Sequence, residues 1–220
     1  MATDKTAAKR ARAHIRYELA DGTRVPGVTT VLNVLNKPAL VNWANKLGLD
    51  GIEVNKYVDV LATIGTVAHA MILAHHKGEQ FPGDEYDPEI VDKAENCLIS
   101  FFEWEKKHDV EVVLAEASLV SEQHRYGGTM DLYCRLDGVL SLIDYKTGKG
   151  IFPEHMYQVA AYRNLLEEHG HKVEQVKILR VGRDENEGFD EKSLADTSRE
   201  WAIFSHALKL YQLGVGKIAA

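Results

Sequence analysis

Apolar and polar residues alternate along the chain in patterns that separate helices from strands. Short alternating runs on either side of Asp21-Gly22 suggest a first hairpin. Helical spacing recurs over 28–35, 39–47, 53–76, 87–107 and 153–170, and again in a last helix that ends near 213. Strand-like patterns cover 111–121, the stretch 127–148 and 173–181, and 184–190 reads as an acidic loop. This order predicts an α/β protein, with a mixed central β-sheet flanked by helices, in one domain over 1–220.

The stretch 127–148 predicts the central feature of the fold. It reads as two strands joined at Asp137-Gly138, a strong signal for a two-residue hairpin turn. Such a turn fixes the register, so that Asp131 faces Asp144 across the pair. Directly opposed residues have Cβ atoms roughly 4.5–5.5 Å apart, and like charges placed so repel each other. Period-two alternation puts Lys146 on the same face as Asp144.

Two carboxylates and an ammonium on one strand face have two readings. A divalent cation between the carboxylates is the simplest neutraliser, and oxygen ligands suit Mg²⁺ or Mn²⁺. The alternative is a solvated polar face with an ordinary Asp–Lys pair. The other face of the hairpin is predicted to be a core face, made by Met130, Leu132, Cys134, Leu136, Val139, Ile143 and Tyr145.

Two more residues could join this chemistry. His69 lies on the apolar face of the 53–76 helix, one turn after Gly65, and is either a metal ligand or a histidine satisfied within the core. Glu116 is a carboxylate among apolar neighbours in the 111–121 strand, where burial without a partner would be costly. It is a further ligand, a water-holding base, or the salt-bridge partner of Arg125.

Composition places few limits on function. Hydrophobic residues make up 45% and charged residues 27% of the chain, which is ordinary for a globular protein. The net charge of −7 argues mildly against a nucleic-acid partner. Basic residues nevertheless gather in two groups, Lys5, Lys9, Arg10, Arg12 and Arg16, and Lys177, Arg180 and Arg183. No run approaches the roughly 18 apolar residues of a membrane span. Two cysteines in apolar stretches suggest buried thiols, so we expect an intracellular, cytoplasmic protein without a membrane role.

Taken in order, these residues resemble a known family. His69 in Gly65-Thr66-Val67-Ala68-His69, then Asp131, then Asp144-Tyr145-Lys146, then Gln158 with Tyr162, are similar to the PD-(D/E)XK nuclease superfamily. The likeness is to its RecB-type exonuclease branch, which includes Cas4 and many phage recombination nucleases, and it covers roughly residues 60–165. The chain departs from older members in having Thr129-Met130, not Pro, before Asp131. It departs from Cas4-like relatives in lacking the four cysteines of an iron–sulfur cluster.

The resemblance implies a fold and an assignment of roles. The fold would be the restriction-endonuclease-like core, with a helical N-terminal cap at 14–50 after a basic arm at 1–13. Mg²⁺ or Mn²⁺ would be bound by Asp131 and Asp144, with His69 and the Tyr145 carbonyl completing the inner shell, and Glu116 is the expected extra ligand. The remaining catalytic residues would be Lys146, which acts on the attacking water, and Gln158 and Tyr162, which position phosphate or water.

The implied function is metal-dependent hydrolysis of DNA by an exonuclease, in phage-type recombination, repair or processing. Its partners would be DNA ends, single-stranded or in resected duplex, and a single-strand-annealing protein. The helical stretch 28–47 would cover the cleft, and bases would stack on an aromatic side chain such as Tyr126 or Trp43. A structure-specific endonuclease or junction resolvase on the same core is the first alternative. A DNA-binding protein with an inert nuclease fold is the second.

Overall fold

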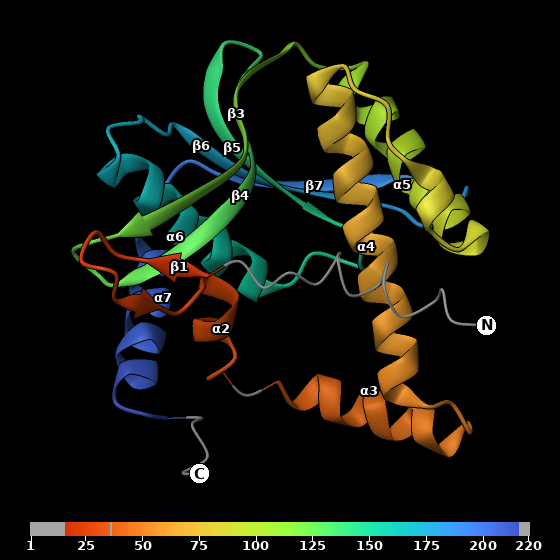
Figure 1. The fold of residues 1–220 in the computed structure, drawn as a ribbon, viewed down its shortest axis with the longest axis horizontal. Coiled ribbons are helices and arrows are strands. Elements are labelled where there is room, and N and C mark those ends of the chain that lie inside the picture. Colours follow the sequence, from red (N-terminus) through yellow and green to blue (C-terminus); the bar gives the residue numbers. More distant parts are fainter. Residues whose placement is uncertain (1–15, 36, 216–220) are drawn as a thin grey trace.

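The computed structural model describes residues 16–35 and 37–215. Its centre is a five-stranded sheet in the order β3-β4-β5-β6-β7 (Figure 1). The strands span Val110–Ser121, Tyr126–Leu136, Val139–Lys146, Gln175–Val181 and Phe189–Leu194. β5 and β6 run parallel, whereas the other neighbouring pairs are antiparallel. The predicted mixed sheet flanked by helices is therefore confirmed, while the predicted basic arm at 1–13 lies outside the described residues.

Helices cover both faces of this sheet and enclose two core clusters. α6 (Pro153–Glu168), α7 (Ser198–Gln212) and α2 (Val28–Leu32) bury their apolar residues in the first cluster. α4 (Val54–Lys77) and α5 (Pro88–Glu105) do so in the second, together with Leu132, Ile143 and Tyr145 of the sheet. A short 3₁₀ turn, η1 (Gly83–Glu85), leads into α5. The small pair β1 (Tyr17–Glu18) and β2 (Arg24–Val25) lies beside the start of β4 (Figure 1).

The hairpin turn has the geometry that its sequence predicts. Asp137 and Gly138 have φ values of 50° and 85°, as a type I′ turn requires at both central positions. Pairing then runs outward from Leu136 opposite Val139 to Leu132 opposite Ile143, in the predicted register. The regular pairing ends there, one step before Asp131 and Asp144.

The predicted core face of the hairpin is wrong in part, because the alternation breaks at Asp131. Met130 and Leu132 would share a face in a regular strand, yet Met130 packs in the first cluster and Leu132 in the second. The neighbouring strand is irregular at the same level, since Glu116 has a φ of 50°. Val139, at the turn, is exposed. Both faces of the sheet are covered by helices, so the hairpin has no single core face to which alternation could be matched.

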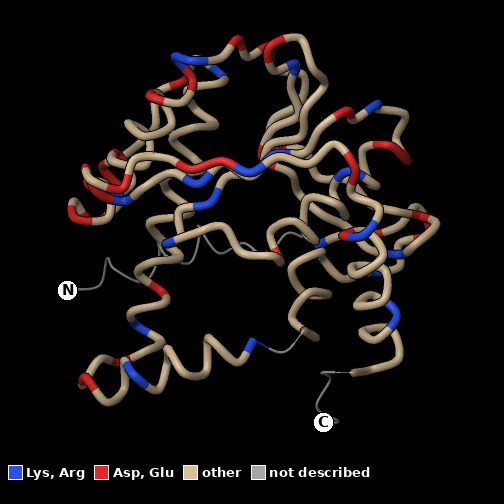
Figure 2. Tube along the Cα trace, turned by 180° about the vertical axis from the view of Figure 1, so that it is seen from behind, with Lys and Arg blue, Asp and Glu red and all other residues tan. Residues whose placement is uncertain are grey.

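β7 is a further correction, because the acidic stretch predicted as a loop over 184–190 is partly a strand. Phe189–Leu194 pairs antiparallel with β6 and forms the sheet edge. The sequence Phe-Asp-Glu-Lys-Ser-Leu is too polar to show a strand pattern. Its carboxylates are satisfied by the neighbouring strand: Glu191 contacts Lys177 at 2.7 Å, and Asp190 contacts Arg180 at 2.7 Å. In Figure 2 the acidic β7 residues run beside the basic positions of β6.

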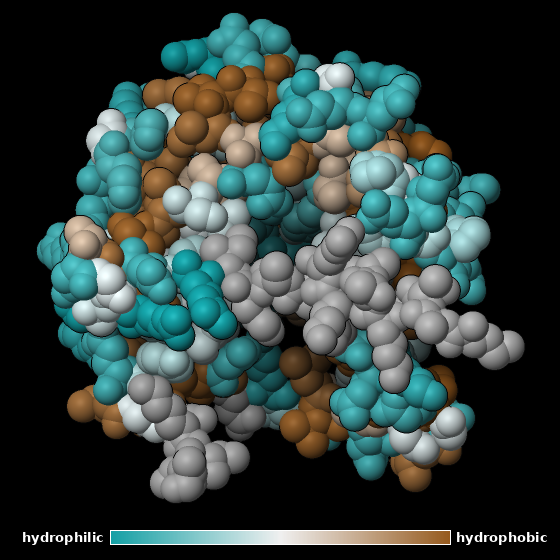
Figure 3. Space-filling model, viewed as in Figure 1, coloured by the Kyte–Doolittle hydropathy of each residue, from teal (hydrophilic) through white to brown (hydrophobic). Residues whose placement is uncertain are grey.

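The N-terminal segment divides into two parts with different surroundings. α2 is built into the core through Val28, Val31 and Leu32. α3 (Pro38–Leu49) has no fully buried residue and lies away from the sheet, at the N-terminal end of α4 (Figure 1). In the space-filling view of Figure 3, the surface over α3 is mixed, with apolar patches among polar atoms. The segment is therefore not one uniform cap.

α4 is long and apolar enough to cross a membrane by length and composition, which the sequence pattern did not indicate. A single helix of this kind is weak evidence for a membrane span, because a core helix meets the same criteria. Here α4 buries Ile64, Val67, Ala68, Met71 and Ile72 against the sheet and α5. The same helix carries His69.

Candidate functional site

Three side chains converge where the sheet becomes irregular. His69 comes from α4, Glu116 from β3 and Asp131 from β4, and their ligand atoms all lie within 4.8 Å of one another. His69 Nδ1 is 3.1 Å from Asp131 Oδ1, while Asp131 Oδ2 accepts a 2.7 Å hydrogen bond from the Tyr145 backbone N–H. The breaks at Glu116 and Asp131 accompany this convergence, as irregular strand segments often re-aim side chains near functional sites.

A second pair lies beside this group. Asp144 on β5 is only 2% exposed and forms an ion pair with Lys146, two residues further along the strand. Its Oδ2 lies against the Lys146 ammonium, so the buried carboxylate has its counter-charge within the protein. A buried carboxylate is costly unless it is paired, so ionised Asp144 depends on the Lys146 ammonium.

The charges of the site are strongly coupled. Burial opposes ionisation of Asp131, but His69, Lys146 and the Tyr145 N–H together hold the pKa of this carboxyl below its ordinary value. Burial and the nearby Asp131 raise the pKa of Asp144 to about 6, although Lys146 acts in the opposite direction. Burial disfavours the charged form of His69, yet the Asp131 carboxylate outweighs it and raises the pKa of this imidazole. The metal-free site therefore favours a proton shared by His69 and Asp131.

Glu116 extends the acidic character of the site. Desolvation and the adjacent Asp131 carboxylate raise the pKa of Glu116. Its carboxyl faces His69 and Asp131, and no ion pair with Arg125 forms among the described residues, so the salt-bridge alternative is wrong. The donor set of one imidazole and two carboxylates, with the Asp144–Lys146 pair nearby, fits Mg²⁺ or Mn²⁺.

The two α6 residues predicted for the site also meet each other. Gln158 Nε2 donates a 2.9 Å hydrogen bond to the Tyr162 hydroxyl, one turn further along the helix. Burial, followed by the Asp144 carboxylate, raises the pKa of Tyr162, which stays a neutral phenol. The ring packs on β4 at Gly128, where a Cβ atom would lie 2.5 Å from a Tyr162 ring carbon. A glycine is required there for α6 to bring Tyr162 against the sheet.

The structure thus gathers most of the sequence-predicted residues but gives them unequal positions. His69, Glu116 and Asp131 form one group, and Asp144 and Lys146 form a pair beside it. Tyr145 contributes its N–H to Asp131, and its ring meets His69 edge-on with centroids 5.9 Å apart. Metal binding by Asp144 and by the Tyr145 carbonyl stays a prediction.

Tyr145 is also held from the second core cluster. His76 Nε2 bonds the Tyr145 hydroxyl at 3.0 Å, and burial and the neighbouring His75 lower the pKa of His76 to about 4. His76 is therefore a neutral core histidine. His75, His76 and Glu105 could in principle hold a cation, but His75 is already bonded to Glu105.

One aromatic residue expected to stack on bases is excluded. Tyr126 is fully buried, and its hydroxyl donates to the Ala161 carbonyl beneath α6. Trp43 on α3 remains 36% exposed. It lines a cavity of about 600 Å³ between α3 and α4 that opens onto His69, Tyr145 and Lys146.

The comparisons with known proteins add context but no family. No protein family matches the chain by sequence, and no curated protein does either. Among solved structures, an alkaline exonuclease (LHK-Exo) in complex with dAMP is similar with a TM-score of 0.45 and 10% identity over 87% of each chain.

The same enzyme, from Laribacter hongkongensis, is also similar in a second structure, with a TM-score of 0.39, 11% identity, and coverage of 89% of this chain and 95% of that one. A protein from Eubacterium rectale, provisionally named an exonuclease, gives a TM-score of 0.49 and 14% identity over 71% of this chain and 66% of its own. These likenesses are too distant to carry a functional argument. The function has to be argued from the site itself.

Proposed function

We propose that this protein is a divalent-cation-dependent deoxyribonuclease that hydrolyses phosphodiester bonds from DNA ends. The observation that carries the proposal is the convergence of His69, Glu116 and Asp131 within 4.8 Å, with the Asp144–Lys146 pair beside them. This set combines ligands for a hard cation with an ammonium that is not a ligand. It is the combination that the PD-(D/E)XK resemblance leads one to expect.

His69, Glu116 and Asp131 would hold Mg²⁺ or Mn²⁺, with Asp144 at the edge of the same site. When bound, the cation would make a coordinated water more acidic and offset charge on the scissile phosphate. Lys146 is held in place by Asp144, so its ammonium can orient the attacking water and stabilise negative charge that develops on phosphate oxygens. The proton shared by His69 and Asp131 must leave before the cation binds.

Gln158 and Tyr162 would act from α6, where burial and the nearby Asp144 and Asp131 carboxylates raise the pKa of Tyr162. Their mutual hydrogen bond fixes the orientation of the amide and the neutral phenol. The phenol O–H can still donate to a phosphate oxygen or water, because Gln158 uses it as an acceptor. We assign these two residues to positioning, and Lys146 to direct stabilisation of the reaction.

An exonuclease is favoured over an endonuclease because α3 stands beside the site. Leu40, Trp43 and Ala44 of this helix form one wall of the cavity that reaches Lys146. A strand lying between α3 and α4 would enter by its end. A role in DNA recombination or repair, with a single-strand-annealing protein as partner, stays a prediction.

The experiment is digestion of end-labelled linear duplex, linear single-stranded DNA, and covalently closed circles of both kinds. Each is incubated with Mg²⁺, with Mn²⁺ and with EDTA. We expect short products from linear DNA with either cation, no products with EDTA, and intact closed circles. Efficient cutting of closed circles would replace the exonuclease assignment with the endonuclease alternative. Absence of cleavage with either cation would favour the inert DNA-binding alternative.

A further inference from the structure

The cavity between α3 and α4 has the composition of a ligand site. Its volume of about 600 Å³ lies within the roughly 300–1,000 Å³ typical of pockets for small organic groups. The apolar part of its wall comes from Leu40, Trp43, Ala44, Val58, Leu61 and Ala62. Leu40 is 52% exposed and Trp43 36%, so both present apolar surface to solvent.

The charged part of the wall has one sign. Lys146 and Arg183 line the cavity, and no Asp or Glu is among the described residues that do so. Lys146 is already paired with Asp144, so Arg183 is the cation of this wall without an ion pair among the described residues. An anionic group with an attached apolar, planar group would satisfy both parts of the wall.

Arg183 has capacity to bind such an anion. Its neighbours in the sequence-predicted basic group, Lys177 and Arg180, are buried and paired with Glu191 and Asp190. The Arg183 guanidinium instead donates to the Thr147 hydroxyl at 3.2 Å, and its Nε is buried without a hydrogen-bond partner. Guanidinium groups bind phosphate through paired N–H donors, and Arg183 lines the cavity, so a phosphate oxygen there is a suitable partner for its guanidinium.

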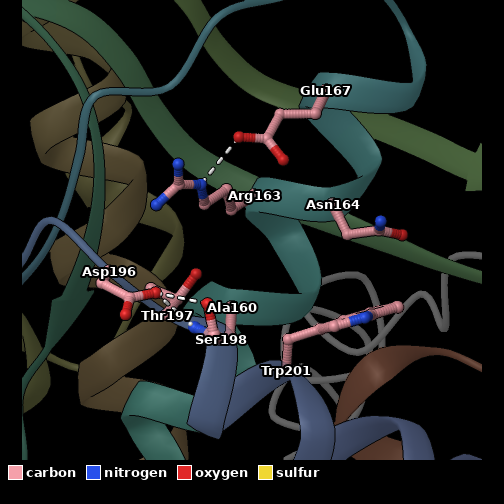
Figure 4. A pocket seen from close by; sticks show the side chains of 8 residues that line it. All are labelled: Ala160, Arg163, Asn164, Glu167, Asp196, Thr197, Ser198 and Trp201. Atoms are coloured by element: carbon pink, nitrogen blue, oxygen red, sulfur yellow. Dashed lines mark hydrogen bonds and ion pairs between the residues drawn. The ribbon is translucent and has the colours of Figure 1, made fainter.

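A second cavity is lined by polar groups that already have hydrogen-bond partners within the protein. It measures about 260 Å³ and lies between α6 and the start of α7 (Figure 4). There Arg163 is bonded to Glu167 at 2.7 Å and to the Ala195 carbonyl at 2.6 Å, and Asp196 accepts from the Ser198 N–H. These groups have partners within the protein, so this cavity gives no comparable indication of a ligand.

From these observations we infer that the α3–α4 cavity binds an unpaired nucleotide of the DNA strand, next to the scissile phosphate. This inference rests on the proposed function and names the substrate class, which is single-stranded DNA at the active end. The base stacks on Trp43 within the apolar wall, and Arg183 binds a backbone phosphate. An unpaired base can lie against Trp43, whereas bases within a duplex are stacked on their neighbours, so a duplex end has to open before its strand enters.

The test measures binding without cleavage. A fluorescein-labelled single-stranded oligo(dT) of eight nucleotides and a blunt duplex of 20 base pairs are titrated with the protein in EDTA, and anisotropy is recorded. The wild-type chain should bind the single strand more tightly than the duplex. Trp43→Ala should weaken binding of the single strand by about 5-fold to 100-fold, as expected for loss of one base–aromatic stack.

Arg183→Gln should weaken binding of the single strand about as much as Trp43→Ala does. It should also change the salt dependence of binding, which Trp43→Ala should not. The slope of log affinity against log salt should become shallower by about 0.7, the value for one phosphate contact with a single strand. Trp43→Ala should leave that slope unchanged. A change of fold alone would not produce this difference, and Arg183→Lys should restore most of the slope.

Matched controls remove comparable groups elsewhere. Leu49→Ala takes a side chain that is 80% exposed from the end of α3, outside the cavity wall. Arg135→Gln removes a surface arginine that pairs with Glu111 near the hairpin turn. Both should bind as the wild type does. The inference is overturned if Trp43→Ala and Arg183→Gln bind within two-fold of the wild type, or if the controls weaken binding equally.

The outcome is separable from that of the proposed function. Loss of binding in the two cavity variants, with no cleavage by the wild-type protein, would keep the nucleotide site and reject the nuclease. Cleavage by the wild type with unchanged binding in both variants would keep the nuclease and reject this site.

Discussion

α6 and α3 both carry apolar residues near the same site, yet these residues have opposite surroundings. α6 buries seven residues against the sheet: Met156, Val159, Ala160, Ala161, Tyr162, Leu165 and Leu166. α3 has none that is fully buried, although Leu40, Val41, Trp43 and Leu49 are apolar and exposed. The apolar surface of α6 stabilises the fold, whereas that of α3 is left for a ligand. The candidate site therefore has a tightly packed helix, α6, on one side and an exposed helix, α3, on the other.

The largest expected effect is at Asp131, which contacts His69 of α4 and the Tyr145 N–H of β5. Asp131→Asn keeps the shape of the side chain but removes the charge that binds the cation. We expect cleavage to fall below detection, and the rise in melting temperature with Mn²⁺ to disappear, because a ligand stabilises only the state it binds. Differential scanning fluorimetry with and without Mn²⁺ provides the measurement.

Asp137→Asn is the matched control, since it changes an exposed aspartate at the turn of the same hairpin. Asn also tolerates the positive φ of this position. It should keep both cleavage and the Mn²⁺ shift. An unchanged shift in Asp131→Asn would remove Asp131 from the cation site.

The next effect separates catalysis from cation binding. Lys146→Ala should lower the cleavage rate by about 10²–10³-fold, the usual loss for one electrostatic stabiliser. The Mn²⁺-dependent shift should persist, because the ammonium is not a ligand. The cleavage rate is measured in single-turnover reactions with a labelled strand. Lys149→Ala, in the exposed loop after β5, is the control variant. Near-normal turnover would exclude Lys146 from the mechanism.

The contrast between the helices can be tested directly through stability. Leu165→Ala on α6 removes a fully buried side chain and should cost about 2–5 kcal/mol of unfolding free energy. Leu49→Ala on α3 should change it by less than about 0.5 kcal/mol. Urea denaturation gives both values. Equal losses would mean that α3 contributes to the core as α6 does, and the comparison would fail.

The smallest effect concerns the cost of keeping Asp144 ionised without a cation. Its folded-state pKa, raised to about 6, lies above its ordinary value, so ionised Asp144 destabilises the fold increasingly as pH rises through that range. In EDTA, Asp144→Asn should therefore raise the unfolding free energy at pH 8. We expect a gain of about 1 kcal/mol, because loss of the ion pair with Lys146 partly offsets the removal of the buried charge. The gain should vanish below about pH 4. Urea titrations at both pH values test this, and an equal gain at low pH would contradict it.

The hairpin illustrates how far local sequence determines the fold. Asp137-Gly138 accepts positive φ, so turn and register follow from two residues, and the five innermost pairs form as predicted. The long helices α4, α5 and α6 and the strands β3 to β6 follow equally from periodicity, whereas β7 does not. The candidate residues His69, Asp131, Asp144, Lys146, Gln158 and Tyr162 are recognisable because their types and order match a nuclease pattern.

Tertiary structure decided which of these groups meet and which charges remain free. The break in alternation at Asp131 joins Glu116 to His69, and no local rule specifies it, because it depends on helices packed against both faces of the sheet. β7 was invisible as a strand, yet its carboxylates neutralise Lys177 and Arg180 and leave Arg183 without an acidic partner among the described residues. The sequence alone determined the chemical groups and their local geometry. Their pairing depended on contacts between segments distant in the chain, where burial and competing partners set the charge of each group.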